Sequence, residues 1–169
     1  MSATGKSFRI RSLQPEDMRA VLAMNAASTP AVGELEAVDL DQLVDVADLA
    51  RVAVRADAVL GTVVALLPGR AYDSPNYRWF DNSGVAFLYV DRVIVAGEAR
   101  GTGVGRALYD DVVRAARAMG LPRVVCEVNE VPPNPSSLAF HEAMGFEGLR
   151  SMQDPRNGKV VRMMELSLG

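Results

Sequence analysis

The sequence feature that most constrains the fold is an apolar strand pattern that leads through a glycine-rich turn into an amphipathic helix. Residues 85–95, VAFLYVDRVIV, have the β-branched and aromatic composition of a central strand. Residues 98–111, EARGTGVGRALYDD, follow with three glycines and two arginines. Apolar residues then recur at helical spacing: Val104, Ala107, Leu108, Val112, Ala115, Ala116 and Met119. Because Gly120 and Pro122 are stop signals, the region predicts a strand, a turn and one helix in direct succession.

The rest of the chain alternates between strand and helix patterns. Alternating or β-branched residues predict strands over residues 8–13, 51–56, 59–67, 123–129, 146–152 and 160–168. Helical spacing and start signals predict helices over residues 15–27, 40–49 and 136–145. The strands at 51–56 and 59–67 are expected to form a hairpin about Asp57 and Ala58. This order indicates a mixed α/β (α+β) fold.

Residues 68–84, PGRAYDSPNYRWFDNSG, have no regular period and are predicted to form a long loop. Long loops inside a compact domain commonly serve as a lid or a binding wall. The aromatic residues of this segment suit contact with a partly apolar ligand. Anchoring of the loop to the body of the protein explains the same residues equally well.

Composition narrows the class of protein. A chain of 169 residues with 49% hydrophobic side chains is enough for one core, so we expect a single domain over residues 1–169. With a net charge of −3, the chain lacks the excess of basic residues that is typical of a nucleic-acid-binding protein. The N-terminal residues lack the apolar core of a signal peptide, and no apolar run approaches the roughly 20 residues of a membrane span. We therefore expect a cytoplasmic protein that binds neither nucleic acid nor membrane.

Cys126 is the single cysteine of the chain. It cannot form an internal disulfide, and no second thiol is present for a zinc cluster. We interpret it as a small buried hydrophobic residue, and no metal site is expected.

The glycine-rich turn is predicted to bind an anion. Unpaired backbone N–H groups at the positive end of a helix dipole favour phosphate, and glycines let the backbone approach it closely. The glycine spacing does not match the G-x-G-x-x-G of dinucleotide-binding folds, which disfavours a Rossmann-like nucleotide enzyme. A nucleoside triphosphate loop requires Lys and then Ser or Thr after the last glycine, whereas Arg106 and Ala107 stand there.

Two motifs in order carry a resemblance to a known family. Residues 100–105 have the pattern Arg-x-x-Gly-x-Gly after an apolar strand, and residues 134–146, NPSSLAFHEAMGF, combine an Asn, a short helix and Gly-Phe. The sequence thereby resembles the GNAT superfamily of N-acetyltransferases, closely over residues 85–146. The resemblance implies a central mixed, mostly antiparallel sheet flanked by helices, with a splayed pair of strands. It also implies acetyl-coenzyme A (acetyl-CoA) as the acetyl donor and coenzyme A as the product.

The resemblance implies a set of cofactor-binding residues. The main chain of Val93 and Val95 would pair with the pantetheine arm, and the N–H of Val95 would stabilise the developing thioester oxyanion. Asn134 corresponds to an Asn near the cofactor arm, although Asn before Pro also caps a helix. The complete predicted set is Val93, Val95, Arg100, Gly101, Thr102, Gly103, Val104, Gly105, Arg106, Asn134 and His141.

Acetylation of an alkylamine requires a base, because the amine is mostly protonated at neutral pH. Glu127 is the first candidate, since several relatives carry a catalytic Glu on this strand. Strand alternation places Glu127 on the opposite face from Cys126 and Val128. Pairing of Glu127 with an arginine, or exposure to solvent, is the alternative. Asp91 is a second candidate base, for which a structural ion pair with Arg92 is the favoured interpretation.

His141 stands where the family usually has a Tyr that protonates the departing thiolate. A histidine titrates near pH 6.5 and a phenol near pH 10. His141 is therefore expected either to act as an acid at lower pH or to hydrogen-bond the sulfur, unless it serves only in packing.

The acceptor is expected to enter beside the segment after the first predicted helix and beside residues 70–82. Candidate substrate-binding residues are Glu34, Glu36, Tyr72, Tyr77, Trp79 and Asp91. Anchoring of these loops is the alternative role.

The sequence as a whole predicts transfer of an acetyl group from acetyl-CoA to a primary amine by direct attack. The acceptor is expected to be a small-molecule amine or a protein amino group. The alternative is a non-catalytic acyl-CoA-binding or sensor domain. A homodimer is compatible with exposed final strands.

Overall fold

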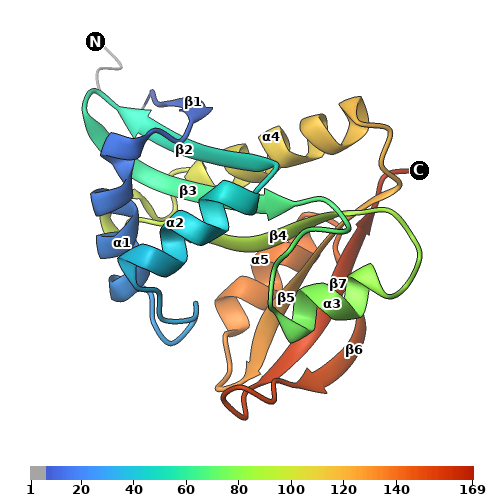
Figure 1. The fold of residues 1–169 in the computed structure, drawn as a ribbon. Helices are drawn as coiled ribbons and strands as arrows, with labels where there is room; N and C mark the ends of the chain where they lie inside the picture. Colours follow the sequence, from blue (N-terminus) through green and yellow to red (C-terminus); the bar gives the residue numbers. More distant parts are fainter. Residues whose placement is uncertain (1–6) are drawn as a thin grey trace.

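The computed structural model describes residues 7–169 as one sheet with helices on both faces (Figure 1). The strands are β1 (Arg9–Ser12), β2 (Leu49–Arg55), β3 (Ala58–Leu66), β4 (Leu88–Val95), β5 (Arg123–Val131), β6 (Glu147–Gln153) and β7 (Val160–Ser167). The helices are α1 (Met18–Ala27), α2 (Ala37–Val46), α3 (Pro75–Asp81), α4 (Val104–Ala118) and α5 (Pro135–Ala143). Short 3₁₀ turns, η1 (Pro15–Asp17) and η2 (Gly97–Ala99), precede α1 and the glycine-rich turn.

The sheet has the order β1-β2-β3-β4-β5-β7-β6. Every neighbouring pair is antiparallel except β4 and β5, which are parallel. Helices α4 and α5 pack on one face through a cluster that includes Leu108 and Val112, and α2 and α3 pack on the other through Leu43 and Phe80. The predicted mixed, mostly antiparallel sheet is confirmed.

Strand β4 changes its pairing halfway along its length. Ala65 of β3 pairs with Val90 and Val64 pairs with Arg92, so Asp91 is an extra, bulged residue. Pairing of β4 with β5 is confined to Leu88 and Tyr89. The two strands separate after this point, and the resulting gap opens beside the start of α4.

Two predicted elements differ from the observed ones. Residues 68–84 are not a continuous loop, because α3 forms within them: Ser74 caps the helix by accepting a hydrogen bond from the Tyr77 N–H, and Pro75 occupies its first turn. The helix predicted at 40–49 begins earlier, at Ala37, because Glu36 and Asp39 form a capping box. It also ends earlier, and Leu49 belongs to β2.

Other boundaries shift without changing the topology. The strand predicted at 85–95 begins at Leu88. Met119, predicted on the buried face of its helix, is the C-cap residue of α4 and remains 45% exposed. Met119 does not pack on the apolar face of the helix because the chain turns away at Gly120, which has a positive φ.

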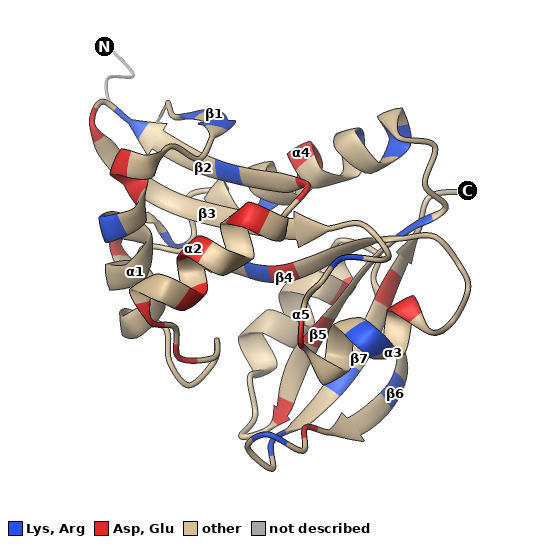
Figure 2. Cartoon of the chain, in the orientation of Figure 1, with Lys and Arg blue, Asp and Glu red and all other residues tan. Residues whose placement is uncertain are grey.

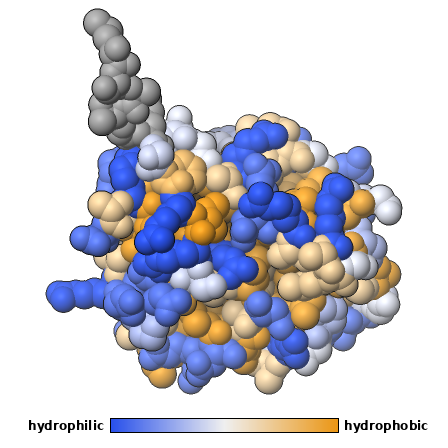
Figure 3. Space-filling view, turned by 90° about the horizontal axis from the view of Figure 1, so that it is seen from above, coloured by the Kyte–Doolittle hydropathy of each residue, from blue (hydrophilic) through white to orange (hydrophobic). Residues whose placement is uncertain are grey.

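On the face seen from above, hydrophilic and hydrophobic residues are interspersed (Figure 3). Within residues 7–169, none of the helices is long and apolar enough to cross a membrane. The apolar side chains are instead concentrated between the sheet and the helices that cover its two faces.

Gly61 provides a test of how closely α4 packs against the sheet. A Cβ atom there would lie 2.9 Å from the carbonyl oxygen of Ile94 and 2.9 Å from Cγ1 of Val104. Gly61→Ala is expected to lower the free energy of unfolding by roughly 1–3 kcal/mol, measured by urea denaturation. Gly97→Ala is the matched control, because nothing lies within 4 Å of its Cβ position, and it should change stability by less than about 0.5 kcal/mol. Equal effects of the two variants would contradict the close approach.

Candidate active site

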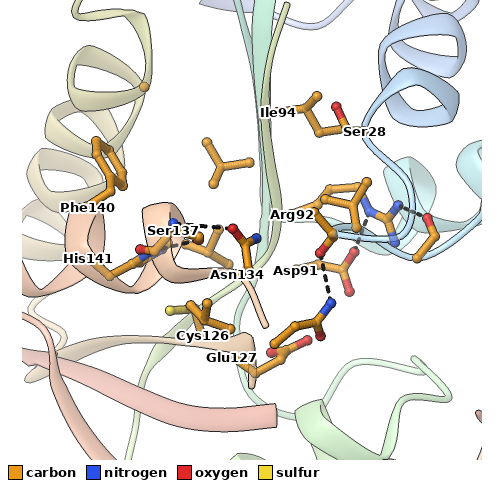
Figure 4. Close-up of a pocket in the computed structure, with 18 of the residues that line it drawn as sticks. Ser28, Asp91, Arg92, Ile94, Cys126, Glu127, Asn134, Ser137, Phe140 and His141 are labelled. Atoms are coloured by element: carbon orange, nitrogen blue, oxygen red, sulfur yellow. Dashed lines mark hydrogen bonds and ion pairs between the residues drawn. The ribbon is translucent and has the colours of Figure 1, made fainter. Parts of the chain in front are cut away.

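A cavity of about 750 Å³ lies where β4 and β5 separate. Its walls come from both strands, the glycine-rich turn, α5, and the segment between α1 and α2. Figure 4 shows Ser137, Phe140 and His141 of α5, with Asn134 at its start, on one side of the cavity. Ser28, Asp91 and Arg92 lie on the other side, and Cys126 and Glu127 of β5 lie at the base (Figure 4). The cavity therefore brings together residues from distant parts of the sequence.

The glycine-rich turn presents free amide groups to one end of the cavity. Gly101 and Gly103 have φ values of +74° and +89°, and nothing lies within 4 Å of a Cβ on either. The first backbone hydrogen bond of α4 runs from the Ala107 N–H to the Gly103 carbonyl, so the three preceding amides have no helical acceptor. These amides, with the exposed Arg100 and Arg106, fit a pyrophosphate group.

Most residues of the predicted turn line the cavity, but Thr102 does not. Its hydroxyl donates to the Ala99 carbonyl within the turn. Gly105 packs against α5, where a Cβ would lie 3.4 Å from Phe140. Thr102 thus stabilises the turn, and Gly105 lets the two helices that flank the cavity approach each other.

The main chain of β4 is open toward the gap. The Ala96 N–H donates to the Leu60 carbonyl of β3, at 2.8 Å. Because successive peptide groups of a strand point to opposite edges, Val95 and Val93 direct their N–H and C=O groups toward the gap. Both valines line the cavity. The gap can therefore accept an extended amide-containing chain between the strands.

Glu127 is half-buried and lies at the base of the cavity, with its carboxyl group between polar side chains. Its Oε1 accepts hydrogen bonds from the Tyr89 hydroxyl, at 2.9 Å, and from Nδ2 of Asn76, at 3.3 Å. Oε2 is buried without a hydrogen-bond partner. Burial and the nearby charge of Asp91 raise the pKa of Glu127 to about 8. A carboxyl group with this pKa and an unpaired oxygen is suited to exchange a proton near neutral pH.

Asp91 and Arg92 form the ion pair that the sequence analysis favoured. The bulge lets consecutive side chains meet on one face, and Arg92 Nε lies 2.8 Å from Asp91 Oδ2. This pair accounts for the adjacent red and blue segments of β4 in Figure 2. Asp91 also accepts a hydrogen bond from the Tyr72 hydroxyl. Arg92 donates to Oδ1 of Asn25 and to the Gly33 carbonyl, which ties β4 to α1 and its following loop.

His141 lines the cavity but its ring nitrogens are already engaged. Nδ1 lies 2.7 Å from the Ser137 carbonyl, which only accepts, so this nitrogen carries the proton. Nε2 then accepts from the Tyr109 hydroxyl, at 2.6 Å. Burial lowers the pKa of His141, which favours this neutral form. In this neutral form neither nitrogen offers a proton to the cavity, so the geometry disfavours the acid role and favours the packing role that the sequence analysis also left open.

Asn134 and Cys126 both line the cavity, from the start of α5 and from β5. The side-chain oxygen of Asn134 accepts from the Ser137 N–H and caps α5, and Asn134 also lines the cavity. Cys126 is buried, and burial raises the pKa of its thiol, so the thiolate is disfavoured. Within residues 7–169, no group of three or more His, Cys, Asp or Glu side chains is arranged to hold a metal ion.

The expected acceptor walls are only partly present. Glu34 and Tyr72 line the cavity, whereas Tyr77, Trp79 and Glu36 do not. Tyr77 is 1% exposed, and its hydroxyl donates to the Leu67 carbonyl. Trp79 packs edge-on against Phe80 of the same helix. Helix α3 packs Tyr77 into the core and half-buried Trp79 against it, which supports the anchoring role that the sequence analysis gave as the alternative to a binding wall.

Sequence reasoning missed several polar residues of the cavity. Asn76 enters from α3, and the Ser74-Pro75 start signal would have revealed this helix. Asn129 and Lys159 donate to the Pro30 carbonyl and hold the segment between α1 and α2 across the cavity. Arg156, paired with Asp154, completes the rim. No local pattern places these residues together, because they come from separate elements.

Comparison with known proteins confirms the family that the resemblance implied. The model of the acetyltransferase (GNAT) family matches residues 19–146, and the chain belongs to this family. Its acetyl donor is acetyl-CoA. A comparison with curated protein sequences gave no match.

Solved structures of similar fold span nearly the whole chain. Ard1 from Thermoplasma volcanium has 18% identity and a TM-score of 0.77. The match covers 96% of this chain and 98% of the Ard1 chain. The ribosomal-protein-S18-alanine N-acetyltransferase from Escherichia coli has 13% identity and a TM-score of 0.74. The match covers 96% of this chain and 95% of the Escherichia coli chain. The ribosomal-protein-alanine N-acetyltransferase from Brucella melitensis has 24% identity and a TM-score of 0.72. The match covers 95% of this chain and 99% of the Brucella melitensis chain. These likenesses establish the fold.

The buried carboxyl group makes stability depend on pH. Glu127 has a pKa of about 8 in the folded protein and an ordinary value of 4.5, so the folded state binds more protons between these values. Stability from this group is therefore lost as pH rises from about 4.5 to about 8. Glu127→Gln should be more stable than the wild type at pH 9, by on the order of 2–4 kcal/mol, and should lose this advantage at pH 5. Denaturation at both pH values measures the difference, and a pH-independent difference would contradict the assigned pKa.

Proposed function

We propose that this protein, acting as a single acetyltransferase domain, acetylates a primary amine by direct attack on acetyl-CoA, with Glu127 as the general base. The observation that carries the proposal is the unpaired, buried Oε2 of Glu127 at the base of the gap between β4 and β5. A buried acceptor without a partner is costly in a folded protein, and such atoms concentrate at functional sites. Here the atom belongs to a residue that lines the cavity.

The glycine-rich turn and β4 would hold the donor. The free amides after Gly103, with Arg100 and Arg106, would bind the pyrophosphate. The main chain of Val93 and Val95 would pair with the pantetheine amides, and the Val95 N–H would stabilise negative charge on the thioester oxygen. Asn134 would meet the same arm from α5. The thioester would then lie between the open edge of β4 and Glu127.

The reaction would transfer the acetyl group from the sulfur of coenzyme A to the amine nitrogen. The amine nitrogen forms a bond to the thioester carbonyl carbon, and the carbon–sulfur bond breaks. The acceptor enters as an ammonium ion and loses two protons overall. Glu127 takes the first proton, which frees the lone pair for attack, and the second passes from the new amide nitrogen to the departing sulfur of coenzyme A. Because a thiol has a pKa near 8.5, the thiolate is a good leaving group and needs no proton from His141. Tyr89 and Asn76 would hold the carboxyl group in place through Oε1.

The acceptor is a small-molecule amine or a protein amino group. Solved structures of the same fold include a ribosomal-protein-alanine N-acetyltransferase from Brucella melitensis and Arabidopsis thaliana Naa50 with the bisubstrate analogue CoA-Ac-MVNAL. These names support testing peptides with free N-termini beside small amines. Glu34, Tyr72 and Asp91 line the side of the cavity where such an acceptor would enter.

The donor site is tested by Gly103→Glu, which puts bulk and negative charge where the pyrophosphate would bind. Calorimetric titration with acetyl-CoA should show binding by the wild type and a loss of at least about 100-fold in affinity in the variant. Gly120→Glu is the matched control, because Gly120 has a similar positive φ at the opposite end of α4 with open space around it. Equal binding by both variants would remove the turn from the donor site.

The base is tested by the pH dependence of turnover. In the wild type, kcat/KM should rise with pH and level off above about 8, where Glu127 loses its proton. Glu127→Gln should lower kcat by roughly 10²- to 10⁴-fold and abolish this inflection, while acetyl-CoA binding is retained. Acceptor-dependent thiol release measures both. A wild type that binds acetyl-CoA but acetylates no amine would instead indicate a non-catalytic acyl-CoA-binding domain.

A further inference from the structure

The segment between α1 and α2 bridges the gap between β4 and β5. This segment, residues 28–34, is the strap, and its members on the cavity wall are Ser28, Ala31, Val32, Gly33 and Glu34. On the β4 side, the Gly33 carbonyl accepts hydrogen bonds from Asn25 Nδ2, at 2.9 Å, and from Arg92, at 3.3 Å. Asn25 is 1% exposed and the Arg92 side chain is mostly buried. Because water competes little for buried donors, this end of the strap is firmly anchored.

On the β5 side, three hydrogen bonds at the protein surface hold the strap. Asn129 Nδ2 donates to the Pro30 and Ala31 carbonyls, at 3.2 Å each. Lys159 Nζ donates to the Pro30 carbonyl, at 3.1 Å. Pro30 and Ala31 are exposed, so water can replace each of these contacts at a modest cost. The strap therefore has one anchored end and one end that can be released, and Asn129 and Lys159 are its latch.

The latch lies on the same face of the sheet as Glu127. Glu127 and Asn129 are two residues apart on β5, and alternation along a strand puts both side chains on one face. The hydrogen bond from Asn76 of α3 to Glu127 identifies this as the face that α2 and α3 cover. Helices α4 and α5, which flank the proposed donor site, pack on the opposite face. An acceptor that approaches Glu127 from its own face therefore meets the strap.

We infer that the latch residues Asn129 and Lys159 select acceptors by size: a small amine reaches Glu127 with the strap closed, whereas a polypeptide N-terminus requires the latch to open. This inference rests on the proposed function, and it names small amines as the preferred acceptor class. A small amine fits within the cavity of about 750 Å³. A polypeptide must also continue outward from its first residues, and the closed strap crosses that path between β4 and β5.

Opening of the strap at the latch sets the penalty on a polypeptide acceptor. Removal of the three surface hydrogen bonds should raise the population of the open strap by roughly 10- to 100-fold. A ligand that binds only a minor state gains apparent affinity in proportion to the population of that state. The polypeptide should gain from a weaker latch in this way, while a small amine that enters past the closed strap should not.

The kinetic test compares benzylamine with a lysine-free peptide that has a free N-terminus. The wild type should favour benzylamine in kcat/KM. The combined variant Asn129→Ala/Lys159→Met should raise the ratio of peptide to benzylamine kcat/KM by roughly 10- to 100-fold, through a gain for the peptide. Gln153→Ala is the matched control, because Gln153 donates to the Gly158 carbonyl near Lys159 and does not line the cavity.

Two kinetic outcomes would overturn the inference. One is a wild type that prefers the peptide. The other is a combined variant in which the peptide gains nothing, whether the ratio stays the same or moves only because benzylamine reacts more slowly. In the second case the latch residues would serve to bind the acceptor or to support the fold, and they would not restrict its size.

A second measurement follows the strap itself and needs neither acceptor nor turnover. NMR backbone order parameters of residues 31–34 are compared in the wild type and the combined variant. Values near about 0.85 are expected for the latched strap and values below about 0.6 for the released one. Equal values would overturn the latch. A released strap in the variant of a protein that acetylates no amine would support the latch and refute the proposed function.

Discussion

The structure depends on the loss of hydrogen bonding between β4 and β5 after Tyr89. Up to that residue the two strands pair as parallel neighbours, and beyond it the bulge at Asp91 redirects β4. An unpaired strand edge inside a sheet is unfavourable unless something covers it, because its amide and carbonyl groups lose their partners. The cavity between the strands is thus the consequence of one extra residue, and it supplies the open main chain that an extended cosubstrate can pair with.

The same bulge organises the electrostatics of the cavity. It brings Asp91 and Arg92 onto one face, where each neutralises the other, and the pair ties β4 to α1 through Asn25. Buried charges are tolerated when they are paired in this way. Glu127 is the exception, because its neighbours donate to one oxygen only and Asp91 adds negative charge nearby. The free-energy cost of burial in this site therefore falls on Glu127, the carboxyl group that the proposed reaction uses.

Local signals predicted the parts of the site that depend on local backbone geometry. The glycines of the turn, the strand before it and the helix α5 all follow from neighbouring residues. The helix α3 was missed because its aromatic residues obscured the start signal at Ser74 and Pro75. His141 could be placed on its helix, but its neutral, engaged state depends on Tyr109, which comes from a different helix. Long-range partners of this kind leave no periodic trace in a sequence.

The sequence by itself determined the family, the order of the strands and of all helices except α3, and the turn where phosphate would bind, because short-range propensities and motif spacing encode them. Only the tertiary structure decided which polar groups share the cavity and what state each adopts. Asn76 contacts Glu127 because α3 packs against β5. Burial at this place raises the pKa of the Glu127 carboxyl group. Proton affinity and hydrogen-bond satisfaction depend on the surrounding volume, and that volume is assembled from segments far apart along the chain.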